Sequence, residues 1–361
     1  MTDLDLNQVL TDINPLDKTW LEKAGERTAQ LLMPTRAMGR LHEISERLCA
    51  IGATLTPSIA KKGILIMAGD HGVVAEGVSA YPQEVTGAMV QTFLAGGAGI
   101  NAVSNQIGAD VWVVDMGIIP ELSPEAMENT GQLTINKIAP GTANLAIGPA
   151  MTREQANEAL LAGFNQASTL FSEGYELLGT GDMGIGNTTP SAAIGAVLTG
   201  CDLDKMVGRG TGVDNTGLDR KKAAIKKGIE TNQPDPSDGI DVLSKVGGFE
   251  IAGIAGSILA SAYHRKPVVI DGFISTAGAL IAHTLNPNVI DYLFAGHCSA
   301  EAGHRVMLAH LKLEPILDLG MRLGEGTGAA LAMGVLDAAV SVFKEVLTFD
   351  EAGVAGKKKN G

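Results

Sequence analysis

The chain has few aromatic residues and few cysteines, and both facts limit the kinds of protein to which it can belong. Aromatic residues make up 4% of 361 residues, and the three cysteines, Cys49, Cys201 and Cys298, are scattered without the spacing of a zinc site. An odd number of scattered cysteines fits reduced thiols in the cytoplasm. The chain has instead 46 glycines and many small aliphatic residues. This composition favours parallel strands packed closely against helices over an all-β sandwich.

Positive charge and long apolar runs are also scarce. The chain has 27 Lys and Arg against 40 Asp and Glu, a net charge of −13, and its basic run is confined to residues 357–359. This balance predicts that the protein does not bind nucleic acid. No apolar stretch reaches the ~20 residues of a membrane span, and the acidic N-terminus lacks the features of a secretory signal. We therefore expect a cytoplasmic protein that has no membrane partner.

Strand and helix segments alternate along most of the chain. Short apolar runs end in glycine or polar residues, which predicts buried parallel strands whose carboxyl ends hold a ligand. The strand candidates are residues 63–67, 111–114, 175–178, 242–246, 267–270, 291–294 and 314–317. Residues 120–149 show weak periodicity and predict a long loop. The alternation predicts an α/β fold with one mostly parallel sheet.

Helical periodicity marks both ends of the chain. Residues 1 to about 55 show helical spacing of apolar side chains, and Pro34 separates two of the predicted helices. A last helix is predicted from about Ala329 to Val346. We therefore predict a small helical domain built from both ends and a large α/β domain, with the boundaries 1–58, 59–330 and 331–361.

The stretch from Gly179 to Pro190, Gly-Thr-Gly-Asp-Met-Gly-Ile-Gly-Asn-Thr-Thr-Pro, follows a strand candidate and precedes an Ala-rich helical run. Its glycines let backbone N–H groups approach an anion, and Asn187, Thr188 and Thr189 add donors at the positive end of the helix dipole. The spacing is neither Walker A nor the dinucleotide fingerprint, which predicts a mononucleotide-sized phosphate. The alternative is a glycine-rich turn with a Thr N-cap and no ligand.

A second informative stretch is Arg322 to Gly328, in which Glu325 lies between glycines just before an apolar helix. A carboxylate in a tight, poorly solvated turn has a raised pKa and can accept a proton near neutrality. Glu325 is therefore the candidate general base. The alternative is a charge that stabilises the N-terminus of the following helix.

Three other patterns allow both a functional and a structural interpretation. The Gly-rich turn at 208–214 precedes clustered cations, of which one could reach an anionic substrate, although a solvated helix face accounts for most of them. Cys298 follows His297, but adjacency in sequence does not bring two side chains together, so a catalytic thiol is not favoured. No metal is predicted, because the candidate histidine and acidic ligands lack the spacing of a metal site. These candidates are Asp70, His71, His297, Glu301 and His304.

Several motifs occur in order over almost the whole chain: residues 67–72 (Met-Ala-Gly-Asp-His-Gly), 81–86, 179–190, 241–248, 271–273, 297–301 and 322–326. Together they resemble one family, the nicotinate-nucleotide:dimethylbenzimidazole phosphoribosyltransferases. The resemblance implies a Rossmann-like parallel sheet, a small helical domain built from both termini, and a homodimer.

The resemblance also implies a reaction. A nitrogen of 5,6-dimethylbenzimidazole, or of a related lower-ligand base, attacks C1′ of nicotinate mononucleotide and gives α-ribazole 5′-phosphate and nicotinate in cobalamin nucleotide-loop assembly. No cofactor and no metal are implied. The pyridinium leaving group departs as a neutral ring and needs no acid, whereas the azole must lose a proton, so one carboxylate base suffices.

The same resemblance implies roles for individual residues. Glu325 matches the family's base, and Asp182 stands where some members have Glu, which makes its role as a second carboxylate less direct. The implied phosphate contacts are Gly184, Asn187, Thr188, Thr189, Lys221 and Ser299. The implied azole contacts are Tyr81, Met89 and Leu323, with Gln83 as a neighbour. Because this azole pocket varies in the family, purines and phenols are alternative acceptors.

Two functions of other classes compete with this interpretation. A non-catalytic nucleotide-binding regulator would use the same phosphate loop but would need no buried carboxylate opposite it, so Glu325 discriminates between the two. A phosphoribosyltransferase that uses a pyrophosphorylated sugar would need Mg²⁺ and an acidic pair after an apolar strand. No such pair follows a strand candidate in this sequence.

Overall fold

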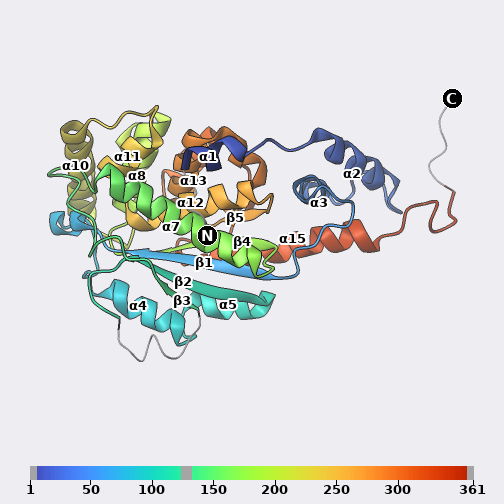
Figure 1. Cartoon of the computed structure of the whole chain (residues 1–361), viewed down its shortest axis with the longest axis horizontal. Helices are drawn as coiled ribbons and strands as arrows, with labels where there is room; N and C mark the ends of the chain where they lie inside the picture. Colours follow the sequence, from blue (N-terminus) through green and yellow to red (C-terminus); the bar gives the residue numbers. More distant parts are fainter. Residues whose placement is uncertain (1–5, 123–131, 356–361) are drawn as a thin grey trace.

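Seven strands form one sheet at the centre of the molecule, in the order β3-β2-β1-β4-β5-β6-β7 (Figure 1). The computed structural model describes residues 6–122 and 132–355. All pairings between neighbouring strands of the sheet are parallel, which confirms the α/β class. The strands are β1 (Lys62–Gly69), β2 (Ala109–Gly117), β3 (Leu133–Ile135), β4 (Leu177–Met183), β5 (Val268–Ile270), β6 (Leu293–His297) and β7 (Pro315–Leu317).

Helices lie on both sides of this sheet, with α7, α8, α12 and α13 above it and α4 and α5 below it in Figure 1. All eight residues of β1 are buried, as expected for a strand covered on both faces. The α-helices after the N-terminal region are α4 (Val85–Leu94), α5 (Gly99–Ile107), α7 (Arg153–Ser172), α8 (Thr188–Thr199), α9 (Leu203–Met206), α10 (Asn215–Asn232), α11 (Gly239–Val246), α12 (Phe249–Tyr263), α13 (Phe273–Leu285), α14 (His304–His310) and α15 (Thr327–Glu345). Two short 3₁₀ helices are η1 (Gly72–Glu76) and η2 (Pro287–Tyr292).

Glycine allows α7 and α12 to pack with their backbones in contact. A Cβ atom at Gly163 would lie 2.0 Å from the carbonyl oxygen of Gly253, and one at Gly256 would lie 1.9 Å from that of Leu160. Any larger side chain at these two positions would force the helices apart. The high glycine content therefore serves close helix packing as well as loops.

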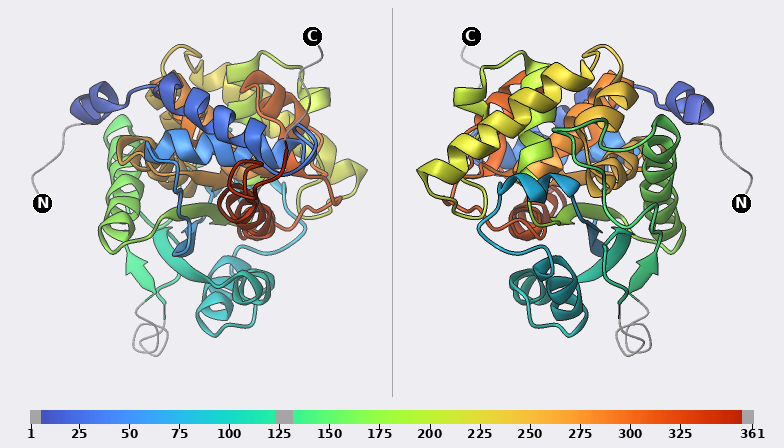
Figure 2. Two further views of the ribbon diagram at one scale, coloured as in Figure 1. Left: turned by 90° about the vertical axis from the view of Figure 1, so that its right-hand side faces the viewer. Right: turned by 90° about the vertical axis from the view of Figure 1, so that its left-hand side faces the viewer.

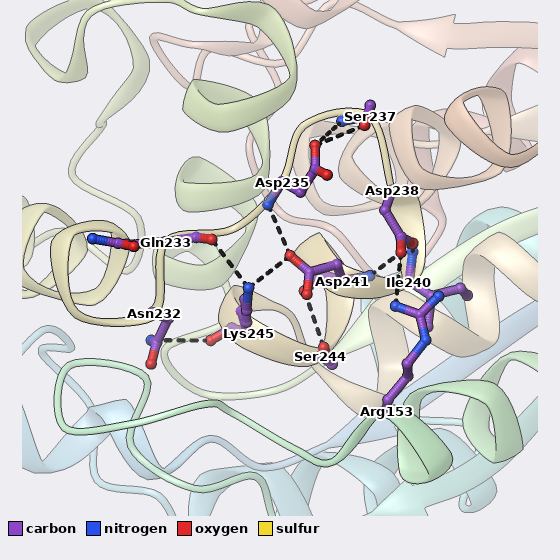
Figure 3. Close-up of polar contacts among 10 residues, drawn as sticks. All are labelled: Arg153, Asn232, Gln233, Asp235, Ser237, Asp238, Ile240, Asp241, Ser244 and Lys245. Atoms are coloured by element: carbon purple, nitrogen blue, oxygen red, sulfur yellow. Dashed lines mark hydrogen bonds and ion pairs between the residues drawn. The ribbon is translucent and has the colours of Figure 1, made fainter.

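One predicted strand is in fact a helix. Residues 242–246 belong to α11, whose first turn is capped by Asp238 through the N–H groups of Ile240 and Asp241 (Figure 3). A short apolar run fits a buried strand and a buried helix equally well, and the Asp before it was the distinguishing signal. The other six strand candidates are confirmed.

The segment predicted as a long loop contains the edge strand β3, which pairs with β2 through three residues. β3 is too short to show a strand period in sequence. Residues 123–131 of the same segment lie outside the described part of the chain, as does the basic run at 357–359.

Helices from both ends of the chain lie together at one end of the molecule (Figures 1 and 2). α15 packs against α3 as well as against β4, β5 and β6, and Ala24, Cys49 and Phe343 form a small core cluster of their own. The domain boundaries at residues 58 and 330 stay a prediction. The N-terminal helices of this end are α2 (Lys18–Gln30) and α3 (Arg40–Gly52), with Pro34 between them as predicted, whereas α1 (Leu6–Asp12) packs against α12.

One described helix, α15, is long and apolar enough to cross a membrane by length and composition. Of the window that meets this criterion, 56% is buried inside the protein. Core helices that are apolar all round have the same composition. The helix is therefore weak evidence for a membrane, and the predicted absence of a membrane partner stays a prediction.

Candidate active site

A cavity of about 700 Å³ opens at the carboxyl edge of the sheet, where open parallel sheets bind ligands. Its walls come from the ends of β4, β5 and β6, the N-terminus of α8, and the turn before α15. The cavity brings together nine of the predicted site residues: Tyr81, Met89, Asp182, Gly184, Asn187, Thr188, Ser299, Leu323 and Glu325.

The predicted phosphate loop lies where expected, between β4 and α8. Gly184 is required there, because a Cβ atom would lie 2.3 Å from the carbonyl oxygen of Gly69. The residue before α8 is Asn187, which makes no side-chain cap bond, so the Thr N-cap of the alternative interpretation is wrong. Thr188 begins the helix and lines the cavity, whereas Thr189 is fully buried behind it.

Lys221 lies one layer behind the cavity wall. Its Nζ donates to Thr188 Oγ1 at 2.6 Å and to the carbonyl of Gly208 at 3.3 Å. Burial lowers the pKa of Lys221 to about 8, and Glu301 opposes the change. No ion pair of Lys221 occurs within residues 6–122 and 132–355. A buried cation without a paired carboxylate is available to an anion bound at Thr188.

Glu325 lies in a strained turn. Its φ is +63°, and the neighbouring Gly324 (φ +84°) and Gly326 (φ +88°) are also left-handed, so three consecutive residues share this conformation. That conformation costs a non-glycine residue about 1–2 kcal/mol. Glu325 Oε2 accepts the N–H of Ile100 at 3.0 Å, in the first turn of α5. Burial raises the pKa of Glu325, as predicted, and the bond from Ile100 opposes the rise.

Asp271 holds this turn from the end of β5. Its carboxylate accepts the N–H groups of Gly326 at 3.1 Å, Gly328 at 2.7 Å and Ala329 at 3.0 Å. Burial raises the pKa of Asp271 to about 7, and the three N–H groups oppose the rise. Asp271 therefore caps α15 from a distant part of the chain and fixes the backbone that carries Glu325.

Asp182 faces the same turn from the end of β4. Its Oδ2 accepts Nδ2 of Asn187 at 2.9 Å, whereas Oδ1 is buried and has no partner in the described part of the chain. Burial, together with the carboxyl groups of Asp271, Glu250 and Glu325, raises the pKa of Asp182 to about 8. Near neutral pH, Asp182 is thus largely protonated and can donate a hydrogen bond.

The azole candidates form the open end of the cavity. Tyr81 is 55% exposed and Leu323 is 60% exposed, and both line the cavity with Met89. Gln83 does not line it: its Nε2 donates to the carbonyl of His71 at 3.2 Å, and it borders a neighbouring hollow of about 340 Å³. Large apolar side chains exposed at the mouth of a cavity are suited to cover a flat ring.

Several lining residues were not predicted as site residues: Gly210, Thr211, Gly272, Phe273, Ile274, His297, Glu301 and Arg322. Gly272 and His297 stand directly at strand ends, a signal that could have identified them. Cys298 is buried, and burial raises its pKa, which is unfavourable for a nucleophilic thiol. Among the residues that the structure describes, no group of three or more His, Cys, Asp or Glu could hold a metal ion.

A parallel sheet whose carboxyl edge combines a glycine-rich loop at a helix N-terminus with buried carboxylates is typical of enzymes that act on a nucleotide-sized substrate. Residues 13–354 match the model of a family described as "Phosphoribosyltransferase". The nicotinate-nucleotide–dimethylbenzimidazole phosphoribosyltransferases of Geotalea uraniireducens (strain Rf4) and Geobacter sulfurreducens are each 52% identical to the chain over 350 residues, which covers 97% of the chain and 98% of each relative.

A solved structure agrees with these sequences. The crystal structure of CobT from Thermus thermophilus superposes with a TM-score of 0.89 at 46% identity and covers 94% of this chain and 100% of that chain. The chain therefore belongs to the nicotinate-nucleotide–dimethylbenzimidazole phosphoribosyltransferase family, as its motifs predicted, and is a pentosyltransferase.

Proposed function

We propose that the chain moves the 5-phosphoribosyl group of nicotinate mononucleotide to 5,6-dimethylbenzimidazole or a related lower-ligand base. The products are α-ribazole 5′-phosphate, for the nucleotide loop of cobalamin, and nicotinate. The observation that carries the proposal is that one cavity holds Glu325, the N-terminus of α8 and an open apolar end. These are a base, an anion site and a ring site.

The reaction needs one bond made and one bond broken at C1′. The azole nitrogen attacks C1′, the bond from C1′ to the pyridinium nitrogen breaks, and its electron pair returns to the pyridine ring. Attack opposite the leaving group inverts C1′ and gives the α-riboside. The azole N–H proton passes to Glu325, whose pKa is raised by burial.

The phosphate end of the substrate meets backbone and hydroxyl donors in this proposal. Gly184, Thr188 and Ser299 face the cavity, and Lys221 acts through Thr188 from behind. Asn187 orients Asp182, which in its protonated form donates to a ribose oxygen. Thr189 is fully buried and supports the helix start.

The acceptor ring binds between Tyr81, Met89 and Leu323, with Gln83 fixing the backbone of His71 nearby. This wall is apolar and open, so purines and phenols are weaker alternative acceptors. We further propose that the chain is a cytoplasmic homodimer that uses no cofactor and binds neither nucleic acid nor membrane. Its net charge of −13 supports the absence of nucleic acid. Light scattering of the full chain would test the dimer.

The experiment is to incubate the chain with nicotinate mononucleotide and a panel of azoles, purines and phenols, and to identify the products by mass spectrometry and NMR. We expect an α-riboside phosphate and one equivalent of nicotinate, fastest with 5,6-dimethylbenzimidazole. A β-riboside would contradict the inversion. Release of nicotinate without a new riboside would identify a hydrolase instead.

A further inference from the structure

Behind the wall that carries Ser299, a buried histidine connects two segments of the cavity. The N–H of Ser299 donates to Nδ1 of His304 at 2.8 Å, and Nε2 of His304 lies 2.9 Å from Oγ1 of Thr276. Thr276 Oγ1 in turn lies 2.7 Å from the carbonyl oxygen of Gly272. His304 and Thr276 are both fully buried. The chain of contacts Ser299–His304–Thr276–Gly272 is here called the His304 chain.

The donors in the His304 chain can be assigned without ambiguity. Nδ1 of His304 accepts an N–H and therefore carries no proton. The Thr276 hydroxyl gives its proton to the Gly272 carbonyl, so its oxygen accepts a proton from Nε2 of His304. One neutral tautomer of imidazole, protonated at Nε2, satisfies both bonds.

The surroundings keep this ring neutral. Burial, together with the nearby His297 and Arg305, lowers the pKa of His304 to about 3. The ring of His297 is 6.2 Å away, measured between ring centroids, and Arg305 is the next residue of α14. His304 therefore keeps one hydrogen-bonding pattern at any pH at which the enzyme works.

The His304 chain ends on two residues that line the cavity. Gly272 precedes α13, whose first residues Phe273 and Ile274 also form the wall. At the other end, Ser299 Oγ accepts the N–H of Glu301 at 3.3 Å. The hydroxyl proton of Ser299 has no acceptor in the part of the chain that the structure describes, so it can be donated to an anion in the cavity.

We propose that His304 is a positioning residue for the nucleotide phosphate, because it holds the Ser299 loop in register with the N-terminus of α13. The inference rests on the proposed function, in which Ser299 contacts the phosphate. The azole wall lies on other elements, so we expect His304 to affect the nucleotide end of the cavity more than the azole end. His304 does not touch substrate itself.

The first test compares variants of the full chain by steady-state kinetics with each substrate varied in turn. His304→Leu removes both bonds and is expected to raise the KM for nicotinate mononucleotide about tenfold or more, with less than a twofold change in the KM for the azole. His304→Asn keeps an acceptor for the Ser299 N–H and is expected to recover most of this loss.

Thr276→Val removes the hydroxyl in the middle of the His304 chain and keeps the shape of the side chain. This variant therefore tests the inference even if His304→Leu fails to fold. We expect a severalfold rise in the same KM. Thr284→Val is the matched control, since Thr284 also lies on α13 and its hydroxyl donates to the carbonyl four residues earlier, that of Leu280, but no hydrogen bond joins it to a histidine in the described part of the chain. It should leave both KM values unchanged. Equal rises in the two KM values for Thr276→Val, or no rise in either, would overturn the inference.

A second measurement does not depend on turnover. In ¹⁵N-labelled wild-type protein, the His304 ring should show the Nε2-protonated tautomer and should not titrate between pH 5 and 9. A titrating ring, or the other tautomer, would contradict the His304 chain. The proposed function fails separately, if the wild-type protein makes no riboside phosphate from nicotinate mononucleotide with any acceptor.

Discussion

The two ends of the cavity, to which the proposed function assigns the base and the phosphate, differ in how their backbone is held. At the base end, three consecutive left-handed residues carry Glu325, and the carboxylate of Asp271 holds them through three N–H bonds. At the phosphate end, the loop of residues 184–187 has one positive φ, at Gly186, and leads directly into α8. At the base end, backbone strain and the cap by Asp271 fix the position of the Glu325 carboxylate. At the phosphate end, the N-terminus of a helix and several hydroxyl groups are available to bind an anion.

This difference predicts which substitutions change the rate and which change binding. A group whose position is imposed by strain acts on the reaction step, where small displacements matter most. Donors spread over a helix terminus act mainly on affinity, because each contributes only part of the attraction to the phosphate.

The largest effect is expected for Glu325→Gln. Turnover should fall by roughly 10² or more, the usual contribution of a positioned base, while both substrates still bind. In the wild-type enzyme the rate should fall as the pH drops through the pKa of Glu325, and the variant should lose this dependence. Stopped assays at saturating substrate would measure both. A loss of less than about threefold would show that Glu325 is not the base.

Next in size is Asp271→Asn, which replaces one acceptor of the cap by an amide donor facing backbone N–H groups. We expect turnover to fall about tenfold, with little change in the KM for nicotinate mononucleotide, because the turn that carries Glu325 loosens. Kinetics at fixed pH and a thermal unfolding curve would be compared. A change in KM alone would place Asp271 at the phosphate end instead.

Lys221→Ala tests the phosphate end. A charge-assisted contact of about 1.5–3 kcal/mol predicts that the KM for nicotinate mononucleotide rises about tenfold or more, with little change for the azole. Lys222→Ala is a suitable control, since Lys222 is the next residue of α10 and pairs instead with Asp204. If both KM values rose equally, the defect would lie in folding or domain closure.

Asp182 predicts an effect on stability and not on the rate. Its pKa is raised to about 8 in the folded protein, above the value of 3.8 for a solvated carboxyl group. The folded state therefore binds more protons, and the stability that this contributes is lost as the pH rises from about 4 to 8. Asp182→Asn should flatten this fall. Melting temperatures at pH 5, 6.5 and 8 would show it, and parallel curves for the two proteins would contradict the assignment.

The smallest effect is expected for metal removal. Because the proposed leaving group is a neutral ring and the proposed phosphate site combines the N-terminus of α8 with Lys221 behind Thr188, EDTA dialysis should change the rate by less than about twofold. Activity lost on chelation and restored by Mg²⁺ or Zn²⁺ would show that the phosphate end is incomplete without a cation.

The sequence predicted those parts of the fold and the site that depend on neighbouring residues. Buried parallel strands are continuous apolar runs, and Glu325 stands out as a carboxylate between two glycines. The cap on its turn could not be predicted, because Asp271 lies 55 to 58 positions before the three N–H groups that it accepts. His304 looked like a doubtful metal ligand until its contacts with Ser299 and Thr276 were known.

Because the backbone at Glu325 is left-handed, selection for stability and selection for turnover favour different residues at this position. Glycine is the residue that would adopt this conformation without steric cost, and both neighbours are already glycine. A chain selected for thermal stability alone would be free to replace Glu325, whereas a chain selected for turnover must keep it. Glu325 is thus one position at which this fold gives up stability for activity.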